Sequence, residues 1–415
     1  MGIAFFSTWL LTRISTAEQY GMYVYAISVT GLLGGMAAAA FDDLSVRQVA
    51  IYGSQQNHRL LRGIVKVGGA VTLALSLLFA LLLYLVPQGF AQNYHYFNQN
   101  KQLLLLSAML LPLWALTQWG QALLRGGKFI VHSQLPDTLI RPVLFLLLVL
   151  LGNFGWRLPS KASTLLLEYT AAAALSLVVC LWWLNKKVVH VVAFNDSQKP
   201  LYDMRNWGKA AASFFLISSL NLINIRTDIL AIGGLLPAAD LGYYNIGVKL
   251  AELLKMAFLV SNIVFAASIA HHFAREDFAA LQRLATRSAW LSTFISLPVA
   301  GILLFWGKDL LAWWGSGFVT AYTAMIVLCV GQLFNLACGL AGNLLAMTGY
   351  ERWIFVSIVL STATNVVLNL WLIPQYGILG AAYATTISTV LKNLIWILVV
   401  YNKLGINPTI LRAKL

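Results

Sequence analysis

The chain has 415 residues, of which 60% are hydrophobic and 10% are charged, and its mean hydropathy is +0.76. Soluble domains carry about 25% charged residues, so this composition excludes a soluble enzyme, a nucleic-acid-binding domain and a disordered chain. A membrane-spanning helix needs about 20 apolar residues, and the apolar content is enough for roughly a dozen of them. The net charge of +14 therefore needs a membrane explanation first.

Apolar runs of spanning length recur along the whole chain, and runs such as 142–151 do not alternate between apolar and polar residues. Because the strands of a membrane β-barrel would alternate, these runs are predicted to be helices. The expected spans are 1–14, 21–41, 64–86, 103–120, 136–155, 164–184, 210–236, 243–270, 288–306, 320–347, 354–373 and 381–401. The predicted fold is an all-α polytopic membrane protein with about 12 transmembrane helices.

Lys and Arg residues are distributed unequally between the connections. The side that contains the connection 15–20 holds only Lys101, Arg157, Lys161 and Lys308, whereas the connections of the other side hold most of the remaining basic residues. Cytoplasmic connections carry the excess of Lys and Arg in membrane proteins. Both termini are therefore predicted to be cytoplasmic, and most of the positive charge is explained by topology.

Two short turns resemble each other and indicate two related halves. Three residues recur 221 positions later: Ala17, Gly21 and Tyr23 match Ala238, Gly242 and Tyr244. Internal symmetry is typical of transporters, although turn-forming Gly and interfacial Tyr can also recur by chance. We predict two parallel-repeat six-helix bundles around a central cavity. They are 1–184 and 210–401, joined by a cytoplasmic linker at 185–209 and followed by a cytoplasmic tail at 402–415.

The first predicted span is short for a membrane helix. Its 14 residues rise only about 21 Å, against a hydrocarbon core of about 30 Å. The repeat offset also places the counterpart of the seventh span's start before Met1. We therefore expect that helix 1 lacks part of its beginning.

Polar and charged side chains inside the spans are candidate functional groups, because an ionisable group costs at least about 2.5 kcal/mol to insert. On the seventh span, Asn221, Asn224 and Asp228 are spaced to share one helical face. Arg226, two residues from Asp228, points elsewhere. Near the middle of the chain these side chains mark a candidate binding face.

The eighth span carries Lys249, Glu252 and Lys255 within about 120° of arc. An ion pair between Lys249 and Glu252 is the structural interpretation. A second lysine on the same face leaves a net positive charge, which suits a cavity for an anion.

Other candidates are spread over the remaining spans. Asp42 and Arg47, where the second span meets the cytoplasm, are either part of a gate or a solvated helix end. Arg13 is either a ligand for the substrate or a snorkelling helix end. Asn365 and Asn369 share a face and favour hydrogen bonding between helices or to a polar substrate.

Embedded basic residues outnumber embedded acidic ones. The basic residues are Arg13, Arg141, Arg226, Lys249, Lys255 and Lys392, and the acidic residues are Asp137, Glu168, Asp228 and Glu252. A cationic cavity would attract an anionic substrate such as a phosphate or pyrophosphate. The i, i+4 spacing of Asp137 and Arg141 also allows a purely structural ion pair.

No motif for catalysis is present. The nearest string to a P-loop, 120–129, has Ala122 in place of a required glycine and Phe129 in place of the Ser or Thr that holds magnesium. No metal-ligand spacing or catalytic constellation occurs, so the chain is predicted to be neither an enzyme nor a cofactor or metal protein. An ion gradient or a substrate gradient would have to supply the energy for transport.

Four segments together resemble a known family. They are 12–23, 226–252, 342–349 and 364–383, and the last includes Asn365, Asn369, Pro374, Gly377 and Gly380. They resemble the Wzx-type oligosaccharide (O-antigen) flippases, the polysaccharide transporter branch of the multidrug/oligosaccharidyl-lipid/polysaccharide exporter superfamily. The resemblance covers nearly the whole chain. It implies twelve helices in two bundles, alternating access and a lipid-linked oligosaccharide as cargo.

The leading hypothesis is a flippase for undecaprenyl-pyrophosphate-linked oligosaccharide in the bacterial inner membrane. Its partners would be membrane lipids, a glycan polymerase and a chain-length regulator, with no nucleic acid. Arg13, Arg226, Lys249 and Lys255 would receive the pyrophosphate. The sugar would be bound by Asn221, Asn224, Asn365 and Asn369. The coupling or gating groups would be Asp228, Glu252, Asp42 and Arg47.

Two alternatives stay open. A cation-coupled multidrug exporter of the same superfamily would prefer an acidic cavity for cationic cargo. A membrane glycan polymerase would be expected to have a larger outer connection with acceptor-site residues.

Overall fold

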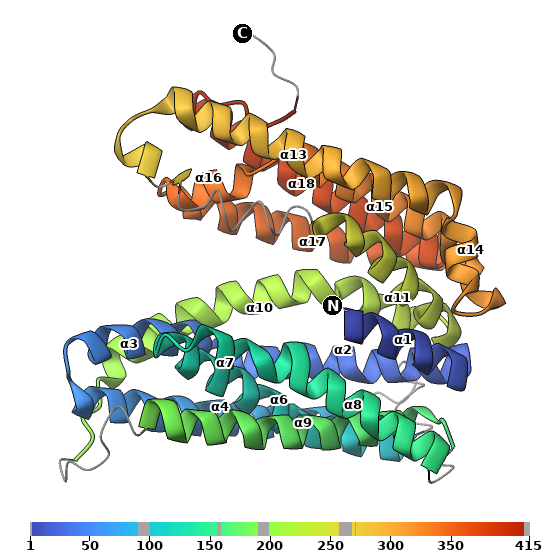
Figure 1. Ribbon diagram of the computed structural model, residues 1–415, viewed down its shortest axis with the longest axis horizontal. Coiled ribbons are helices and arrows are strands. Elements are labelled where there is room, and N and C mark those ends of the chain that lie inside the picture. Colours follow the sequence, from blue (N-terminus) through green and yellow to red (C-terminus); the bar gives the residue numbers. More distant parts are fainter. Residues whose placement is uncertain are drawn as a thin grey trace. The chain divides into compact units, whose positions relative to one another are not determined.

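The computed structural model describes residues 2–89, 100–155, 159–189, 199–256, 268–269 and 271–410. Within these ranges every regular element is a helix, as predicted for an all-α membrane protein. The chain divides into two compact units, Met1–Ile223 and Asn224–Leu415, and the division falls within one long helix, α10 (Met204–Leu235). Figure 1 shows the helices of each unit in sequence colours.

The first unit contains helices from α1 to the beginning of α10. Their bounds are α1 Gly2–Ile14, α2 Ala17–Ala39, α3 Asp42–Ser54, α4 His58–Gly89, α6 Lys101–Gly126, α7 Ile130–Leu135, α8 Arg141–Leu150 and α9 Ala162–Leu184. Single π-helical turns, Pro136–Ile140 and Leu151–Gly155, come before and after α8. Such turns widen a helix locally and are frequent at functional sites.

Helix α6 is the central element of the first unit, and it packs against α2, α3, α4 and α9 (Figure 1). The buried core at one end of the unit includes Leu44, Leu61, Leu123 and Trp207. Trp207 lies in the first turn of α10, and its indole Nε1 donates a 3.0 Å hydrogen bond to the Tyr52 hydroxyl. The first half of α10 is thereby anchored to the first unit.

The second unit contains the rest of α10 and the helices that follow it. Their bounds are α11 Ala238–Glu252, α13 Phe278–Phe305, α14 Gly307–Ala312, α15 Tyr322–Ala337, α16 Ala341–Met347, α17 Glu351–Tyr376 and α18 Ile378–Leu404. A 3₁₀ turn, Leu253–Lys255, extends α11. Helix α18 packs against α15, α16 and α17, and α11 packs against α15.

Ten stretches of the described chain are long and apolar enough to cross a membrane. They are Ala17–Ser54, His58–Leu85, Lys101–Gly126, Ile130–Asn153, Ala162–Lys187, Met204–Leu235, Phe278–Phe305, Ser316–Ala337, Glu351–Tyr376 and Ile378–Leu404. The prediction of a multi-pass membrane protein is confirmed. Two of the predicted spans, 1–14 and 243–270, are not among the ten, and residues 257–267 and 270 of the latter lie outside the described residues.

The helices are longer than the predicted spans. Helices α4, α10 and α13 begin 6, 6 and 10 residues before the apolar runs at 64, 210 and 288. A backbone that enters lipid must satisfy its own hydrogen bonds, and the same helix continues through the polar interface at little cost. Apolar runs therefore locate the middle of each helix better than its ends.

Helix starts recur at nearly constant offsets. Helices α2 and α11 begin 221 residues apart, α4 and α13 begin 220 apart, and α7 and α17 begin 221 apart. A residue with positive φ precedes each helix in two of these pairs. Gln56 precedes α4 and Glu276 precedes α13, while Lys128 precedes α7 and Gly349 precedes α17. These offsets are what the predicted repeat would produce.

The predicted linker and tail are described in part. Residues 190–198 of the linker and 411–415 of the tail lie outside the described residues. The Leu201 amide of the linker donates a 3.1 Å hydrogen bond to the Arg59 carbonyl, within the first unit. In the tail, Asn407 exchanges two hydrogen bonds with the side chain of Gln282, which attaches the tail to α13.

Candidate functional site

A buried carboxyl group lies on α10 in the second unit. Asp228 is 8% exposed, and its Oδ2 accepts a 2.8 Å hydrogen bond from the Tyr244 hydroxyl on α11. Its Oδ1 accepts a 2.9 Å bond from the Ile229 amide. Burying a carboxylate is expensive unless it is hydrogen-bonded, so these donors hold Asp228 between α10 and α11.

Cationic side chains gather on the same unit. Lys249 on α11 is half-buried, and the charges of Glu252 and Arg226 act on its ammonium group. Lys255 and Lys392 are also close enough for their charges to interact. The charges of Arg226 and Glu252 act on Lys249, and Glu252 pairs with Lys255, so these groups of the second unit form one electrostatic neighbourhood.

One ion pair forms on the helical face of α11 and its 3₁₀ extension. Lys255 Nζ lies 3.4 Å from Glu252 Oε1, and both side chains are exposed. The sequence suggested an ion pair between Lys249 and Glu252; the charge of Glu252 acts on Lys249, and Glu252 also pairs with Lys255. Because both side chains are exposed, Glu252 and Lys255 are accessible, and their pairing contributes little to stability.

Helices α17 and α18 are joined by a network of polar side chains. Asn369 donates a 3.0 Å bond to Asn365 Oδ1, and Asn365 donates to the Ser388 and Thr385 hydroxyls on α18 at 3.2 and 3.4 Å. The Ser361 hydroxyl donates to the Ser388 carbonyl at 2.9 Å. Both asparagines are buried, and Asn369 Oδ1 accepts no hydrogen bond. This is the hydrogen bonding between helices that their spacing favoured.

The two remaining asparagines of α10 differ in their surroundings. Asn224 donates a 2.9 Å hydrogen bond to the Thr362 hydroxyl on α17, within the second unit. Asn221, on the first-unit side of the division, is exposed. Of the two asparagine side chains predicted to share this face, that of Asn224 is hydrogen-bonded and that of Asn221 is exposed.

The other candidate residues of the first unit lie on two helices, Arg13 on α1 and Asp42 and Arg47 on α3. Arg13 is exposed at the end of α1, with its guanidinium 5.9 Å from the Trp9 ring centroid. Asp42 forms an ion pair with Arg125 that joins the beginning of α3 to the end of α6. Arg47, also on α3, is exposed.

Arg141 is buried in the first unit, and its partners are aromatic and acidic. Its Nη2 lies 2.7 Å from Asp137 Oδ1, and its guanidinium lies 5.0 Å from the ring centroid of Trp114 and 6.0 Å from that of Tyr169. The pair begins in the π-helical turn before α8. The structural ion pair predicted from the i, i+4 spacing is present.

Sequence reasoning left several polar residues out of the candidate site. Lys392 is predicted to be embedded but receives no role from the sequence, and its ammonium lies 5.0 Å from the Trp396 ring centroid. The sequence identifies Tyr244 only as the repeat partner of Tyr23, and Thr362, Thr385 and Ser388 carry no signal, because single hydroxyl groups are common in membrane helices. Among the residues that the structure describes, no group of three His, Cys, Asp or Glu side chains could hold a metal ion.

Comparison with solved structures defines the fold. An inward-facing multidrug resistance MATE family transporter of the MOP superfamily matches with a TM-score of 0.73 at 10% identity, covering 96% of this chain and 94% of that one. The lipid II flippase MurJ in an inward closed conformation matches with a TM-score of 0.67 at 14% identity, covering 96% and 87%. At these identities the likeness shows a shared transporter fold.

Sequence comparison identifies the family. A Shigella flexneri protein named "Putative O-antigen transporter" is 22% identical over 412 residues, which are 95% of this chain and 92% of that protein. The model of the family described as "Polysaccharide biosynthesis protein" matches residues 1–269. With a family match over more than half of its length, the chain belongs to the polysaccharide biosynthesis protein family, as the resemblance of its segments predicted.

Proposed function

We propose that the chain is a flippase that moves undecaprenyl-pyrophosphate-linked oligosaccharide repeat units from the cytoplasmic to the periplasmic leaflet of a bacterial inner membrane. Family membership and the named relatives support transport of a lipid-linked polysaccharide precursor. The observation that carries the proposal is the surplus of cations in the second unit. Among the described groups of this neighbourhood, the acidic ones are Asp228 and Glu252. The basic ones, which outnumber them, are Arg226, Lys249, Lys255 and Lys392.

The cations are assigned to the pyrophosphate. Arg226 and Lys249 are close enough for their charges to interact, and they would bind one phosphate group of the pyrophosphate together. Lys255 and Lys392 would bind the other phosphate group. Arginine and lysine side chains are the usual ligands of phosphate oxygens. Arg13, exposed at the end of α1, is proposed as a first contact for the cargo.

The asparagines are assigned to two tasks. Asn221 and Asn224 present amides along α10 and would bond sugar hydroxyl groups. The bonds of Asn365 and Asn369 to α18 favour a positioning task, in which they hold α17 and α18 together at the site. Asn369 Oδ1 accepts no hydrogen bond, but the side chain is 0% exposed, so a sugar hydroxyl would reach it only after α17 and α18 separate.

Coupling and gating are assigned to the carboxyl groups. Asp228 is held by a donor from α11, so a proton or cation on the carboxylate would change the contact between α10 and α11. Glu252, in its exposed pair with Lys255, would adjust the charge that the cargo meets. In the first unit, Asp42 with Arg125, and nearby Arg47, would restrain α3 during alternating access at the cytoplasmic end.

Localisation and partners follow from the proposed cargo. Both termini would be cytoplasmic, in keeping with the Lys and Arg distribution. A glycan polymerase and a chain-length regulator would act on the translocated repeat units. A multidrug exporter, the second candidate, is favoured by the fold match to MATE transporters, but the cationic neighbourhood of the second unit opposes cationic cargo.

The proposal is tested in a strain in which the gene is deleted. Loss of surface polysaccharide together with lipid-linked repeats at the cytoplasmic face would support flipping, and the wild-type gene should restore both. Arg226→Ala and Lys249→Ala should fail to restore them, whereas Lys249→Arg should restore them because it keeps the charge. Lys403→Ala, which removes an exposed cation at the end of α18, is the matched control and should behave like wild type.

Three results would overturn the assignment. Full complementation by both Arg226→Ala and Lys249→Ala would remove the cationic site. Normal surface polysaccharide with altered drug tolerance would indicate a drug exporter. Single repeat units on the surface without long chains would indicate a polymerase.

A further inference from the structure

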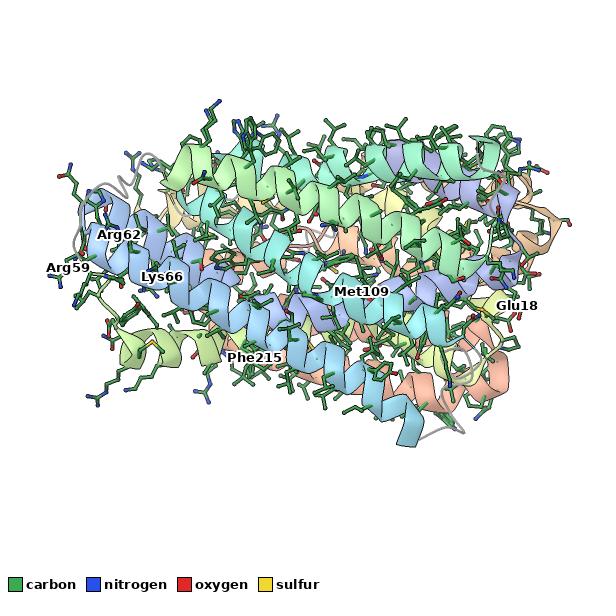
Figure 2. The ribbon with its side chains drawn as sticks, turned by 90° about the horizontal axis from the view of Figure 1, so that it is seen from below. Glu18, Arg59, Arg62, Lys66, Met109 and Phe215 are labelled. Atoms are coloured by element: carbon green, nitrogen blue, oxygen red, sulfur yellow. The ribbon has the colours of Figure 1, made fainter. Side chains whose placement is uncertain are left out.

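The end of α9 lies at the same end of the first unit as the beginning of α4. The Ala162 amide, at the beginning of α9, donates a 2.8 Å hydrogen bond to Gln19 Oε1, and Gln19 directly follows Glu18. Figure 2 shows Glu18 at the opposite end of the unit from Arg59 and Lys66, which are in the first turns of α4. Helix α9 has 23 residues and rises about 35 Å, so its last residues lie at the end with Arg59 and Lys66.

Aromatic rings join the end of α9 to the beginning of α7. The His132 ring on α7 lies edge-on to the Trp183 ring on α9, with the ring centroids 5.1 Å apart. It also lies edge-on to the ring of Phe129, the residue before α7, at 6.2 Å. Phe129 and Trp183 pack against the buried core at this end of the unit. The three rings therefore hold the two helix ends together.

Two consecutive lysines at the end of α9 lie over aromatic rings. Lys187 Nζ is 5.7 Å from the centroid of the Phe129 ring, and Lys186 Nζ is 5.2 Å from that of the Trp182 ring. A cation over the face of a ring is attracted to it, so both ammonium groups are positioned. The lysines lie in a π-helical turn, Asn185–Val189, and the candidate membrane span of α9 ends at Lys187. Both charges are therefore at the depth of lipid headgroups.

The surface around these lysines is accessible. Ile130, Val131 and Trp182 are 65%, 68% and 56% exposed. Lys186 is exposed and Lys187 is half-buried. A ligand can therefore reach both ammonium groups and the apolar side chains beside them.

The described elements around the lysines place no unpaired carboxylate near them. Helices α6 and α7 and the π-helical turn contain neither Asp nor Glu. On α9 the acidic residue is Glu168, about 27 Å from Lys186 along the axis, and Asp137, which follows α7, is paired with Arg141. Lys128, exposed before α7, adds a third cation, so the surface carries a net positive charge.

Exposed apolar side chains continue from the lysines along both spans. On α9, Val178 and Leu175 lie within about 11 Å of Trp182 along the axis. On the neighbouring span, Leu139 lies about 12 Å beyond Val131. Half of the hydrocarbon core is about 15 Å thick, so each of these two apolar rows has the depth of one leaflet. The turn before α8 and α8 itself pack against α9, so the rows lie on neighbouring helices.

We propose that the end of α9 and the beginning of α7 form a binding site for an anionic diacyl phospholipid. The phosphate lies against Lys186 and Lys187, and the acyl chains follow the two apolar rows. Basic pockets between membrane helices attract anionic headgroups, and burial of acyl chains on an apolar surface adds to the affinity. Two rows on neighbouring helices suit a lipid with two chains, whereas the proposed polyprenyl-linked cargo has one.

The test uses the full-length protein in detergent, titrated with phosphatidylglycerol or phosphatidylcholine and followed by native mass spectrometry. Wild type should bind phosphatidylglycerol more tightly, because only that lipid has a net negative charge, and equal affinities would overturn the site. Lys186→Gln/Lys187→Gln should lower the affinity for phosphatidylglycerol about 30-fold and leave that for phosphatidylcholine unchanged. Lys186→Arg/Lys187→Arg should keep the wild-type affinity, because it keeps both charges.

The matched control is Lys101→Gln/Lys161→Gln, which removes two exposed cations from the same unit. Lys161 directly precedes α9 and is about 38 Å from Lys186 along the axis, and Lys101 begins α6, about as far from the end of that helix. Because charges beyond about 10 Å are screened, this variant should bind phosphatidylglycerol within about twofold of wild type. Equal losses in both double variants would reduce the effect to net charge and overturn the site. Displacement of phosphatidylglycerol by an equimolar polyprenyl phosphate would also overturn it, because the site would then belong to the single-chain carrier lipid.

Discussion

The Tyr244 hydroxyl on α11 donates a 2.8 Å hydrogen bond to Oδ2 of Asp228 on α10, and both side chains are buried. The two residues are 16 positions apart, on either side of the turn between these helices. The bond therefore links a carboxyl group that is proposed to sense ions to the helix that carries Lys249. A change in the charge of Asp228 would act directly on this contact between α10 and α11.

Tyr244→Phe tests this link. The substitution leaves the ring and removes one donor from a buried carboxylate, and a hydrogen bond to a charged group contributes about 1.5–3 kcal/mol. We expect a lower melting temperature in detergent and reduced complementation of the deletion strain. Tyr243→Phe is the control, because the Tyr243 ring packs on Phe318 in an edge-to-face contact. Equal melting temperatures for Tyr244→Phe and wild type would contradict the role of the bond.

Asn365→Ala tests the polar network between α17 and α18. The change removes the acceptor of Asn369 and the donor to Ser388, and leaves a buried amide unsatisfied, which costs about 1–3 kcal/mol. The melting temperature should fall, and the loss should not be additive with that of Ser388→Ala, since the two side chains share one bond. Asn221→Ala, at an exposed position, should leave the melting temperature unchanged. Additive losses in the double variant would show that the two side chains act independently.

The spans and the buried cations could be predicted from the sequence for a physical reason. A lipid-exposed backbone must be helical, and a helix in lipid must be apolar for about 20 residues. Lys249 and Lys392 stand out in such a run because few charged residues are tolerated there. The helix ends could not be predicted, as α13 shows, because its first ten residues lie before the apolar run.

Spacing predicted the ion pair of Asp137 with Arg141, but it could not predict every partner of a charged group. Lys249 and Lys255 are both three residues from Glu252, so the sequence does not distinguish them. In the structure Glu252 pairs with Lys255, where the chain changes to a 3₁₀ turn at Leu253–Lys255 and residues three apart are eclipsed, and its charge also acts on Lys249. The bond between Asp228 and Tyr244 depends on how two helices pack, and no local pattern contains that information.

Asp137→Asn tests the buried ion pair of the first unit. Arg141 is 4% exposed, and without Asp137 it would be a buried cation beside the rings of Trp114 and Tyr169 that has lost the carboxylate of its ion pair. Removing one partner of a buried pair costs about 3–5 kcal/mol, whereas replacing both with apolar residues is often neutral. We expect a large fall in melting temperature for Asp137→Asn and recovery in Asp137→Leu/Arg141→Met.

Asp43→Asn, which removes an exposed carboxylate from α3, is the control for that comparison and should leave the melting temperature unchanged. If the apolar double variant restored stability but abolished complementation, the ion pair would have a role in transport. If the double variant were as unstable as Asp137→Asn, the pair would not be the source of the destabilisation.

Gly380→Ala tests the close approach of α18 to the end of α17. A Cβ atom at Gly380 would lie 2.3 Å from the Leu372 carbonyl oxygen, so the backbones would have to separate. Forcing extra volume into a packed interface typically costs about 1–3 kcal/mol, and separation here would also strain the network around Asn365 and Ser388. Gly301→Ala on α13 is the matched control, because no atom lies within 4 Å of its added Cβ. Alanine favours a helix over glycine by about 1 kcal/mol, so Gly301→Ala should raise the melting temperature slightly, whereas Gly380→Ala should lower it. Equal effects of the two substitutions would show that the contact with Leu372 does not determine the stability of this interface.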